Sequence, residues 1–376
     1  MDNTFNKKYS MIFNGVYKDK TVLITGHTGF KGSWLSLWLK RLGANVIGYS
    51  LPPATNPNNF DSAGLKEKII NYFGDTRDTS KITEVVKKHA PEFIFHLASQ
   101  PIVRKSYLDP KETYEINLIG LINILEAIRI NKLPMVFINI TTDKCYENKE
   151  WIWPYREIDT LGGYDPYSAS KACSEIITSS YRNSFFNEQK YFEHKVAVAT
   201  VRAGNVIGGG DWSEDRIIPD CVRSLSMNKP IVVRNPNAIR PWQHVLEPLA
   251  GYLWLGAKMF EEGEKYCSAW NFGSIFPKNI NVLDLVKLVI DLWGNGTFKV
   301  DSKESNLHEA NYLKLDSHKA INNLKWEPVL DIKKTIEMTA LWYKRYYSGE
   351  KDSFKLCNEQ IDEYEKLAKE KNLYGM

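Results

Sequence analysis

Short apolar runs alternate with longer amphipathic stretches over the first half of the chain. The runs are rich in Val and Ile and lack polar alternation, which predicts strands covered on both faces, as in a parallel sheet. They lie at residues 21–26, 45–50, 93–99, 135–142 and 196–207. Helices are expected between them, at residues 31–43, 80–90, 117–130 and 167–185. This order predicts an α/β fold with a doubly wound parallel sheet.

The regular alternation ends near Gly208, where loops with Trp, Pro and Arg begin. We expect a first domain over residues 15–207, to which later segments return, and a smaller mixed lobe mainly over residues 208–345. Residues 350–376 form a predicted helical tail. Its apolar stripe is Phe354, Cys357, Ile361, Tyr364 and Leu367. Such a stripe indicates a packing or dimer contact.

Composition and charge narrow the class of protein. The 376 residues are 43% hydrophobic and 25% charged, with a net charge of +4, which gives little support to a nucleic-acid partner. No apolar run reaches the length of a membrane span, and the first twenty residues lack a signal peptide. The five cysteines show no CxxC or metal-ligand spacing. We therefore expect a cytoplasmic protein with reduced thiols, no membrane partner and no metal.

Three glycines follow the first predicted strand and open the first predicted helix. Gly26 permits a tight turn, Gly29 lets backbone amides approach a pyrophosphate, and Gly32 allows close packing of helix on strand. The positive end of the helix then faces the phosphates. This context predicts a Rossmann-like dinucleotide site, with a purely structural turn as the alternative. His27, between the glycines, has no assigned role.

The choice of dinucleotide is not settled at the second strand. This strand ends in Gly48-Tyr49-Ser50, without the usual acidic residue for the ribose hydroxyls and without an Arg for a 2′-phosphate. Asp75, in the segment GDTRD, follows a further short apolar stretch that lies between the runs at 45–50 and 93–99, where a carboxylate can accept the adenine amine. A solvated loop carboxylate is an equally good interpretation of Asp75.

A tyrosine and a lysine lie four residues apart on a predicted helix. The spacing of Tyr167 and Lys171 places both side chains on one face. A nearby ammonium favours the phenolate and lowers the pKa of the tyrosine, so the pair can remove a proton from an alcohol.

Polar residues also end the buried strand before that helix. Thr141, Thr142, Asp143 and Lys144 follow the run at 135–142, at the edge where doubly wound sheets bind ligands. A cap made by Thr and Asp is the structural alternative, but it gives no reason for Lys144.

Three of these motifs occur together in one known superfamily. GxxGxxG, TTDK and YxxxK resemble the extended short-chain dehydrogenase/reductase superfamily. The segments GHTGFKGSWL, QPIVRKSY, RAGNVIGGGDW and RPWQHVLEP further resemble the branch of its nucleotide-sugar 4,6-dehydratases that acts on CDP-glucose. The resemblance covers roughly residues 15–345.

The resemblance implies a hydride transfer within one sugar, with NAD as a regenerated cofactor. Tyr167, helped by Lys171 and Thr142, takes the proton of the 4-hydroxyl while the C4 hydride passes to NAD. The 4-ketone acidifies the C5 hydrogen, so that water can leave from C6 with Asp143 as general acid. The hydride then returns to C6.

Lys144 departs from the commoner nucleotide-sugar 4,6-dehydratases, which have Glu here as the C5 base. The CDP-glucose branch carries Lys, so the residue supports that branch. The identity of the base stays open, because an ammonium must first become neutral to accept a proton.

The expected binding residues fall into two sets. We assign the cofactor to Gly26, Thr28, Gly29, Phe30, Lys31, Gly32, Asp75, Arg77, Leu97, Ala98, Gln100, Tyr167 and Lys171. Three arginines of the second lobe suit a substrate diphosphate: Arg216, Arg234 and Arg240. The resemblance adds Gln100, Arg104 and Asn205 to the substrate site. For each of these alone, a surface or structural role is the alternative.

Other functions remain to be weighed. A dehydratase for another nucleotide sugar or a nucleotide-sugar 4-epimerase keeps the same fold, but an epimerase does not need an acid at Asp143. A non-catalytic, redox-sensing dinucleotide-binding regulator predicts loss of Tyr167 or Lys171, and both are present. We expect a homo-oligomer, a dimer or dimer of dimers, that pairs through helices 117–130 and 167–185.

Overall fold

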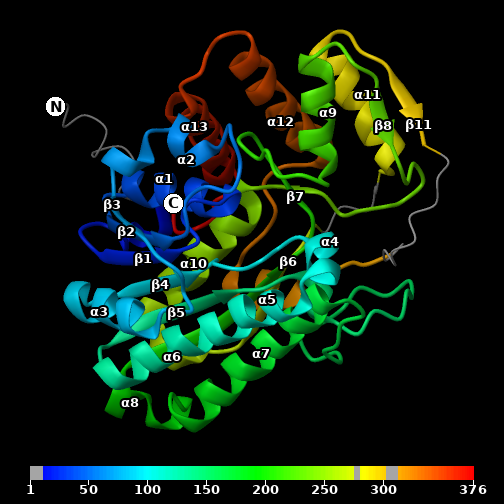
Figure 1. The fold of residues 1–376 in the computed structure, drawn as a ribbon. Coiled ribbons are helices and arrows are strands. Elements are labelled where there is room, and N and C mark those ends of the chain that lie inside the picture. Colours follow the sequence, from blue (N-terminus) through cyan, green and yellow to red (C-terminus); the bar gives the residue numbers. More distant parts are fainter. Residues whose placement is uncertain (1–11, 275–279, 302–311) are drawn as a thin grey trace.

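The computed structural model describes residues 12–274, 280–301 and 312–376 (Figure 1). Its centre is a seven-stranded sheet in the order β10-β6-β5-β4-β1-β2-β3, and every neighbouring pair is parallel. The strands are β1 (Thr21–Thr25), β2 (Asn45–Ser50), β3 (Ile70–Phe73), β4 (Phe93–His96), β5 (Met135–Ile140), β6 (Val196–Ala203) and β10 (Ala269–Phe272). The predicted α/β fold with a doubly wound parallel sheet is confirmed.

The apolar runs located most of the sheet. All five predicted runs contain a strand, and the last one divides into β6 and the short β7 (Val206–Ile207). Strands β3 and β10, at the two edges of the sheet, were not predicted. Each has only four residues, and the exposed or half-buried residues of β3 include Asn71. A short edge strand therefore carries too few apolar positions to stand out.

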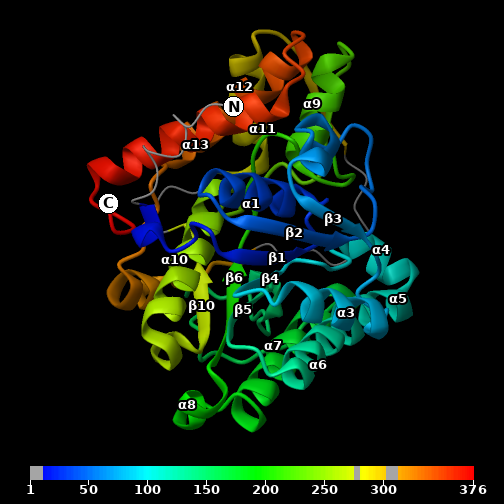
Figure 2. The ribbon, with the colours of Figure 1, turned by 90° about the vertical axis from the view of Figure 1, so that its left-hand side faces the viewer.

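Helices cover both faces of the sheet (Figure 2). One face packs on α3 (Thr79–His89), α6 (Gly120–Asn131) and α7 (Pro166–Ser184). The other packs on α1 (Phe30–Arg41) and α10 (Leu246–Glu262). In β1, Val22 and Ile24 join the α1 side and Leu23 joins the α6 side, all fully buried. This two-sided burial explains why the strands read as continuous apolar runs.

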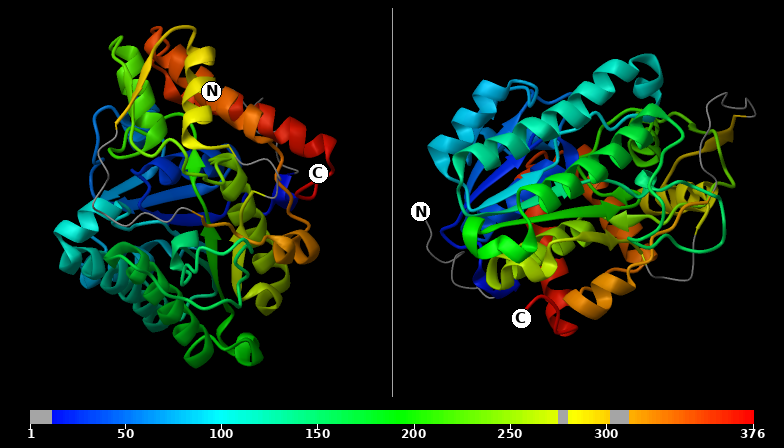
Figure 3. Two further views of the ribbon diagram at one scale, coloured as in Figure 1. Left: turned by 90° about the vertical axis from the view of Figure 1, so that its right-hand side faces the viewer. Right: turned by 90° about the horizontal axis from the view of Figure 1, so that it is seen from below.

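The smaller lobe is built from the later chain (Figure 3). It contains α9 (Ile217–Ser226), β8 (Ile231–Val233), α11 (Val282–Trp293) and β11 (Phe298–Val300), with β8 and β11 paired in parallel. A second small sheet pairs β7 with β9 (Gln243–His244). After it, α10 and β10 rejoin the main sheet. Short α-helices in the described part of the first domain are α2 (Asn59–Ser62), α4 (Val103–Leu108), α5 (Pro110–Tyr114) and α8 (Tyr191–His194).

The tail forms α13 (Ser353–Glu370), which packs against α1 and α12 (Ile332–Tyr347) of its own chain. Trp38 Nε1 donates to Glu365 at 2.8 Å, and the Tyr364 hydroxyl donates to the buried Glu247 at 2.9 Å. The tail therefore closes the core on the α1 side. Within the described ranges, no helix is both long enough and apolar enough to cross a membrane.

Candidate active site

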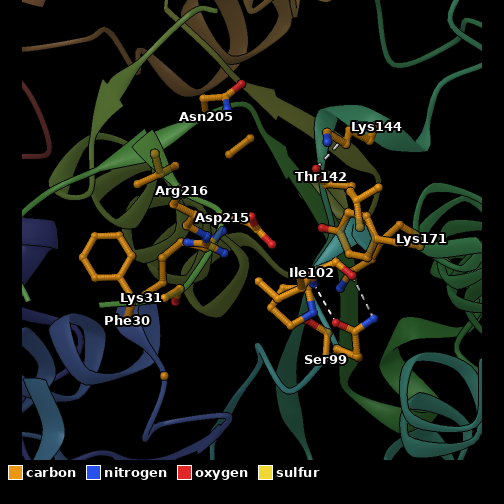
Figure 4. A pocket seen from close by; sticks show the side chains of 18 of the residues that line it. Phe30, Lys31, Ser99, Ile102, Thr142, Lys144, Lys171, Asn205, Asp215 and Arg216 are labelled. Carbon is orange, nitrogen blue, oxygen red and sulfur yellow. Dashed lines mark hydrogen bonds between the residues drawn. The ribbon is translucent and has the colours of Figure 1, made fainter. Parts of the chain in front are cut away.

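A cavity of about 1180 Å³ opens at the carboxyl ends of the strands (Figure 4). Residues at the ends of β1 to β6, or just after them, line it, and α9 and the residues after β8 line its far side. The strand order reverses between β1 and β4. Open α/β sheets bind ligands at such a switch point, so the cavity lies where the fold predicts a site.

The glycine loop between β1 and α1 forms one wall of this cavity. Gly26 has a φ of +73°, and a Cβ there would lie 2.7 Å from the backbone nitrogen of Ala98. A Cβ on Gly32 would lie 2.1 Å from the carbonyl oxygen of Gly26. Helix α1 begins after Gly29, whose position provides no side-chain cap for the first amides. These features fit the pyrophosphate of a dinucleotide at the positive end of the helix.

His27 has a structural role in the same loop. The ring is fully buried, and its Nε2 lies 2.6 Å from Asn71 Oδ1 on β3. Gly48 makes room for it, because a Cβ on Gly48 would lie 2.3 Å from the ring. Burial lowers the pKa of His27 to about 4, so the ring is neutral at physiological pH. The absence of a side chain at Gly48 on β2 thus serves packing.

The end of β2 carries hydroxyls in place of an acid. The Thr28 and Ser50 hydroxyls lie 3.0 Å apart, and both residues line the cavity. Asp75 also lines it, with a carboxylate that accepts from Arg77 at 2.6 Å. The guanidinium holds the pKa of Asp75 below its usual range. Arg77 itself is not among the described residues that line the cavity, so it reaches the site only through Asp75.

Helix α7 brings Tyr167 and Lys171 to the cavity. Asp165 caps the helix by accepting from the Ser168 amide at 2.9 Å, and Pro166 occupies its first turn. Tyr167 and Lys171 are both buried and both line the cavity.

The charges of this pair differ from the expectation. Burial raises the pKa of Tyr167 to about 12, although a side-chain hydrogen bond with Thr142 acts in the opposite direction. Burial, followed by the charge of Lys31, lowers the pKa of Lys171 to about 7. The prediction that Lys171 lowers the pKa of Tyr167 is therefore wrong for this arrangement, because burial of the phenol dominates and the lysine donates to Ile140.

The polar residues after β5 form a short 3₁₀ turn, Asp143–Cys145. Thr142 caps this turn by accepting from the Lys144 amide at 3.4 Å, and its hydroxyl donates to Asp143 Oδ1 at 2.9 Å. Thr142 thus both caps the turn and reaches the site. The carboxyl of Asp143 is 4% exposed, and burial raises its pKa despite the nearby Lys144. This environment favours the protonated form that a general acid requires.

Sequence reasoning missed the group that supports this turn. Glu175, buried on α7, accepts from Thr141 at 2.5 Å and from Thr200 at 2.6 Å, and it pairs with Arg202 at 2.9 Å. The network ties α7 to β5 and β6 beneath the cavity. The signal was present, because Glu175 follows Lys171 by four residues on the same helical face.

The predicted phosphate ligands gather at the cavity but have carboxylate partners. Arg216 pairs with Asp211 at 3.0 Å, and Arg234 pairs with Asp215 at 2.9 Å. All the predicted substrate residues line the cavity: Gln100, Arg104, Asn205, Arg216, Arg234 and Arg240. The acidic partners were missed, although Asp211 and Asp215 closely precede Arg216 in the sequence.

Two predicted residues have more specific surroundings than the sequence showed. The side-chain amide of Gln100 donates to Ile102 and Thr113 and accepts from the backbone amide of Ile102 at 2.6 Å, so it also fixes its own loop.

Lys31 and Arg216 lie on the same side of the pocket (Figure 4). Burial and the Arg216 charge lower the pKa of Lys31 to about 8. Four other predicted cofactor residues line the cavity: Thr28, Phe30, Leu97 and Ala98.

The parallel sheet, the glycine loop and the Tyr167–Lys171 pair define an enzyme of the extended short-chain dehydrogenase/reductase class. A model of the family described as GDP-mannose 4,6 dehydratase matches residues 23–339. The chain belongs to this family.

Relatives and solved structures agree with this assignment. A CDP-glucose 4,6-dehydratase of Salmonella typhimurium is 45% identical over 354 residues, which covers 94% of this chain and 98% of the relative. An epimerase structure from Methanothermobacter thermautotrophicus has a TM-score of 0.76 at 22% identity, covering 91% of this chain and 97% of that one. A Bacillus anthracis dTDP-glucose 4,6-dehydratase in complex with NAD has a TM-score of 0.69 at 19% identity, covering 88% and 98%. The two solved structures show the shared fold.

Proposed function

We propose that this protein is a CDP-glucose 4,6-dehydratase, which converts CDP-glucose to CDP-4-keto-6-deoxyglucose. The observation that carries the proposal is a buried carboxyl, Asp143, in the same cavity as Tyr167 and Lys171. With a hydride acceptor bound, oxidation of an alcohol needs only the tyrosine and lysine from the protein, whereas loss of water also needs an acid. The relative that is 45% identical along nearly the whole chain is a dehydratase of this sugar nucleotide.

The cofactor is NAD, as in the B. anthracis neighbour. The loop of Gly26, Gly29 and Gly32 fits its pyrophosphate. Side chains at Gly26 and Gly32 would clash with backbone atoms, so the tight turn that brings the start of α1 to the cavity requires glycine at both positions. When bound, NAD supplies a hydride acceptor that returns the hydride within the same turnover. The proposed holding residues beyond the glycines are Thr28, Phe30, Lys31, Asp75, Leu97, Ala98, Gln100, Tyr167 and Lys171, with Arg77 acting through Asp75.

The first proton transfer takes place at Tyr167. Its phenol oxygen removes the proton of the sugar 4-hydroxyl as the C4–H bond breaks and C4 becomes a ketone. Thr142 forms a hydrogen bond with this phenol, and the neighbouring Lys171 supplies a positive charge on the same helix. The hydrogen bond with Thr142 offsets part of the cost of burying the phenolate.

Elimination of water then uses the turn after β5. The 4-ketone acidifies the C5 hydrogen, and Lys144 is the proposed base that removes it as a proton. Asp143 gives its proton to the 6-hydroxyl, which leaves as water. The hydride that left C4 is added at C6, and the proton that Lys144 took returns to C5. Tyr167 gives up the proton of the 4-hydroxyl and Asp143 takes one up through solvent, so the net change is loss of one water molecule. The raised pKa of Asp143 keeps a proton available for this step.

The diphosphate and the sugar have separate contacts in this proposal. Guanidinium groups suit phosphate oxygens, because they donate in a planar fork. The proposed phosphate ligands are Arg216, Arg234 and Arg240, while Gln100, Arg104 and Asn205 approach the sugar or its phosphate. The dinucleotide domain would then be residues 15–207 with the later returning segments, and the substrate lobe mainly residues 208–345.

A direct assay tests the function. The protein is incubated with NAD and separately with the CDP, dTDP, UDP and GDP derivatives of glucose, and the product is measured by the alkali absorbance of 4-keto-6-deoxy sugars. We expect product from CDP-glucose at a higher kcat/KM than from the others. Equal or better turnover of another nucleotide would contradict the CDP assignment. A 4-epimer without alkali absorbance would contradict dehydration.

We further propose a homodimer that works in the cytoplasm. Exposed apolar residues on α6 and α7 or at their ends support pairing of these helices: Ile119 (47%), Ile130 (58%), Ile176 (57%) and Phe185 (48%). Burying such side chains against a second copy is favourable. All five cysteines are free thiols, which is consistent with a reducing compartment.

A further inference from the structure

A carboxylate that the catalytic scheme does not use lies at the cavity. Asp215 lines it on the loop before α9, one residue before Arg216 (Figure 4). The φ of Asp215 is +58°, a left-handed conformation that few residues other than glycine, asparagine and aspartate adopt readily. The loop thus carries a residue suited to its backbone shape, and it presents the carboxylate to the arginines around it.

Two arginines from distant parts of the chain share one oxygen of this carboxylate. Arg104 on α4 lies 3.2 Å from Asp215 Oδ1, and Arg234, after β8, donates to the same oxygen at 2.9 Å. Arg104 follows β4 of the main sheet, whereas Arg234 belongs to the smaller lobe. Asp215 therefore connects the two sides of the cavity.

These ion pairs are of a kind that another anion can replace. The side chains of Arg104, Asp215 and Arg234 retain 38%, 34% and 36% exposure. Partly exposed ion pairs contribute little net stability, because water screens them. Arg234 also keeps a second partner, Asp220 at 3.1 Å, so losing Asp215 would not leave its guanidinium unpaired.

We propose that Asp215 is a specificity-determining residue that competes with the phosphates of the substrate for Arg104 and Arg234. The inference rests on the proposed function, because it takes these arginines as ligands of a diphosphate. Carboxylate and phosphate oxygens are equivalent acceptors for a guanidinium, and like charges placed together repel. A ligand must bring enough negative charge to displace Asp215. A nucleoside diphosphate meets this demand better than a monophosphate, so Asp215 sharpens the preference for two phosphates.

The test removes the charge and keeps the backbone. Asp215→Asn suits a left-handed position, since asparagine also adopts it. Glu214→Gln is the matched control, because Glu214 is an exposed acid on the same loop and is not among the described residues that line the cavity. Calorimetry measures the Kd of CDP and of CMP for each NAD-loaded protein, at low ionic strength, where screening is weakest. Asp215→Asn is expected to bind CDP about two- to fivefold more tightly. The affinity for CMP should increase more than the affinity for CDP, so the Kd of CMP divided by the Kd of CDP should fall. Both Kd values of Glu214→Gln should match those of the wild type.

The sign of the effect decides between two roles. If Asp215 instead holds the arginines ready for phosphate, Asp215→Asn binds CDP more weakly, and that result or unchanged Kd values would overturn the proposal. Titration with pyrophosphate separates this outcome from failure of the proposed function. Wild-type protein that ignores CDP, yet binds pyrophosphate more tightly after Asp215→Asn, refutes the CDP assignment and upholds the competition. Protein that binds neither ligand overturns both.

Discussion

The ammonium of Lys171 donates to the carbonyl oxygen of Ile140 at 3.3 Å, which fixes the lysine of α7 against the last residue of β5. Helix and strand therefore hold one another at the point where the chain turns toward Thr142 and Asp143. The bond positions Lys171 beside the cavity. The edge that carries Tyr167 and Lys171 is thus built by the main sheet. Arg216, Arg234 and Arg240 come from the smaller lobe, whereas Arg104 lies on α4, after β4.

Tyr167→Phe should abolish oxidation and leave binding nearly intact. The substitution removes one oxygen from a buried ring and preserves its volume, so the packing of α7 should persist. We expect kcat to fall by at least about 100-fold, the lower end of what a general base contributes. The measurement is turnover of CDP-glucose with CDP affinity as the folding control. Retention of more than about a tenth of the wild-type rate would show that Tyr167 is not the base.

Asp143→Asn should separate oxidation from elimination. The amide cannot donate the proton that the 6-hydroxyl needs to leave, whereas Tyr167 can still remove the 4-hydroxyl proton. The hydride then has no carbon to return to, and reduced cofactor should accumulate on mixing with CDP-glucose. Stopped-flow absorbance in the near ultraviolet, where reduced nicotinamide absorbs, follows it. No accumulation of reduced cofactor would remove the acid role from Asp143.

Lys144→Ala tests the proposed C5 base. As the base, its removal should stop entry of solvent deuterium at C5 while oxidation at C4 continues. As a purely electrostatic group, its removal should weaken substrate or cofactor binding and leave exchange per bound complex unchanged. Mass spectrometry of the sugar after incubation in deuterium oxide distinguishes these outcomes. Exchange at the wild-type rate in saturated Lys144→Ala would assign the base role to another group.

The sequence predicted those features of the fold and the site that depend on residues close together in the chain. The doubly buried strands, the glycine turn and the spacing of Tyr167 and Lys171 are all set by neighbours in sequence, and each is found where it was expected. The pKa of Tyr167 was not predictable in this way. It depends on burial of the phenol, which outweighs the hydrogen bond with Thr142 and the charge of Arg216.

At the substrate side of the cavity, the ion pairs between residues far apart in the chain could not be predicted from the sequence. Arg216, Arg234 and Arg240 were predicted as phosphate ligands from their charge and their motifs. Their partners were not, because Arg104 and Asp215 are more than a hundred residues apart and meet only through the fold. The contact between Gly48 and the His27 ring also forms only in the fold. The sequence shows that β2 ends without an acid, but it does not show that a buried histidine packs against Gly48 on this strand.

Ile176→Glu should dissociate the proposed dimer. Ile176 is 57% exposed on α7, and a carboxylate there would have to be desolvated in a helix-to-helix interface. Sedimentation at micromolar concentration should show a dimer for the wild type and a monomer for the variant. Met227→Glu is the control, because Met227 is 60% exposed after α9, away from the proposed surface. A wild-type monomer, or a variant that stays dimeric, would contradict pairing through α7.

Glu365→Gln should reduce the pH dependence of stability. Burial raises the pKa of Glu365 on α13 to about 7, even though Trp38 and Arg41 donate to it. An exposed glutamate in the unfolded chain has a pKa of about 4.3. Between these values the folded protein keeps a proton that the unfolded chain has lost. The contribution to stability is therefore fully present below about pH 4.3 and is lost as the pH rises toward about 7.

The expected slope is a fall in the free energy of unfolding of up to about 1.4 kcal/mol per pH unit within that window. Glutamine cannot titrate, so the variant should lose this part of the slope. It should keep the part due to Glu247, whose pKa burial also raises to about 7. Urea unfolding of both proteins at pH 5, 6, 7 and 8 measures the difference. Parallel curves for the two proteins would mean that the Glu365 carboxyl is ionised in the folded state, with Arg41 compensating the cost of its burial.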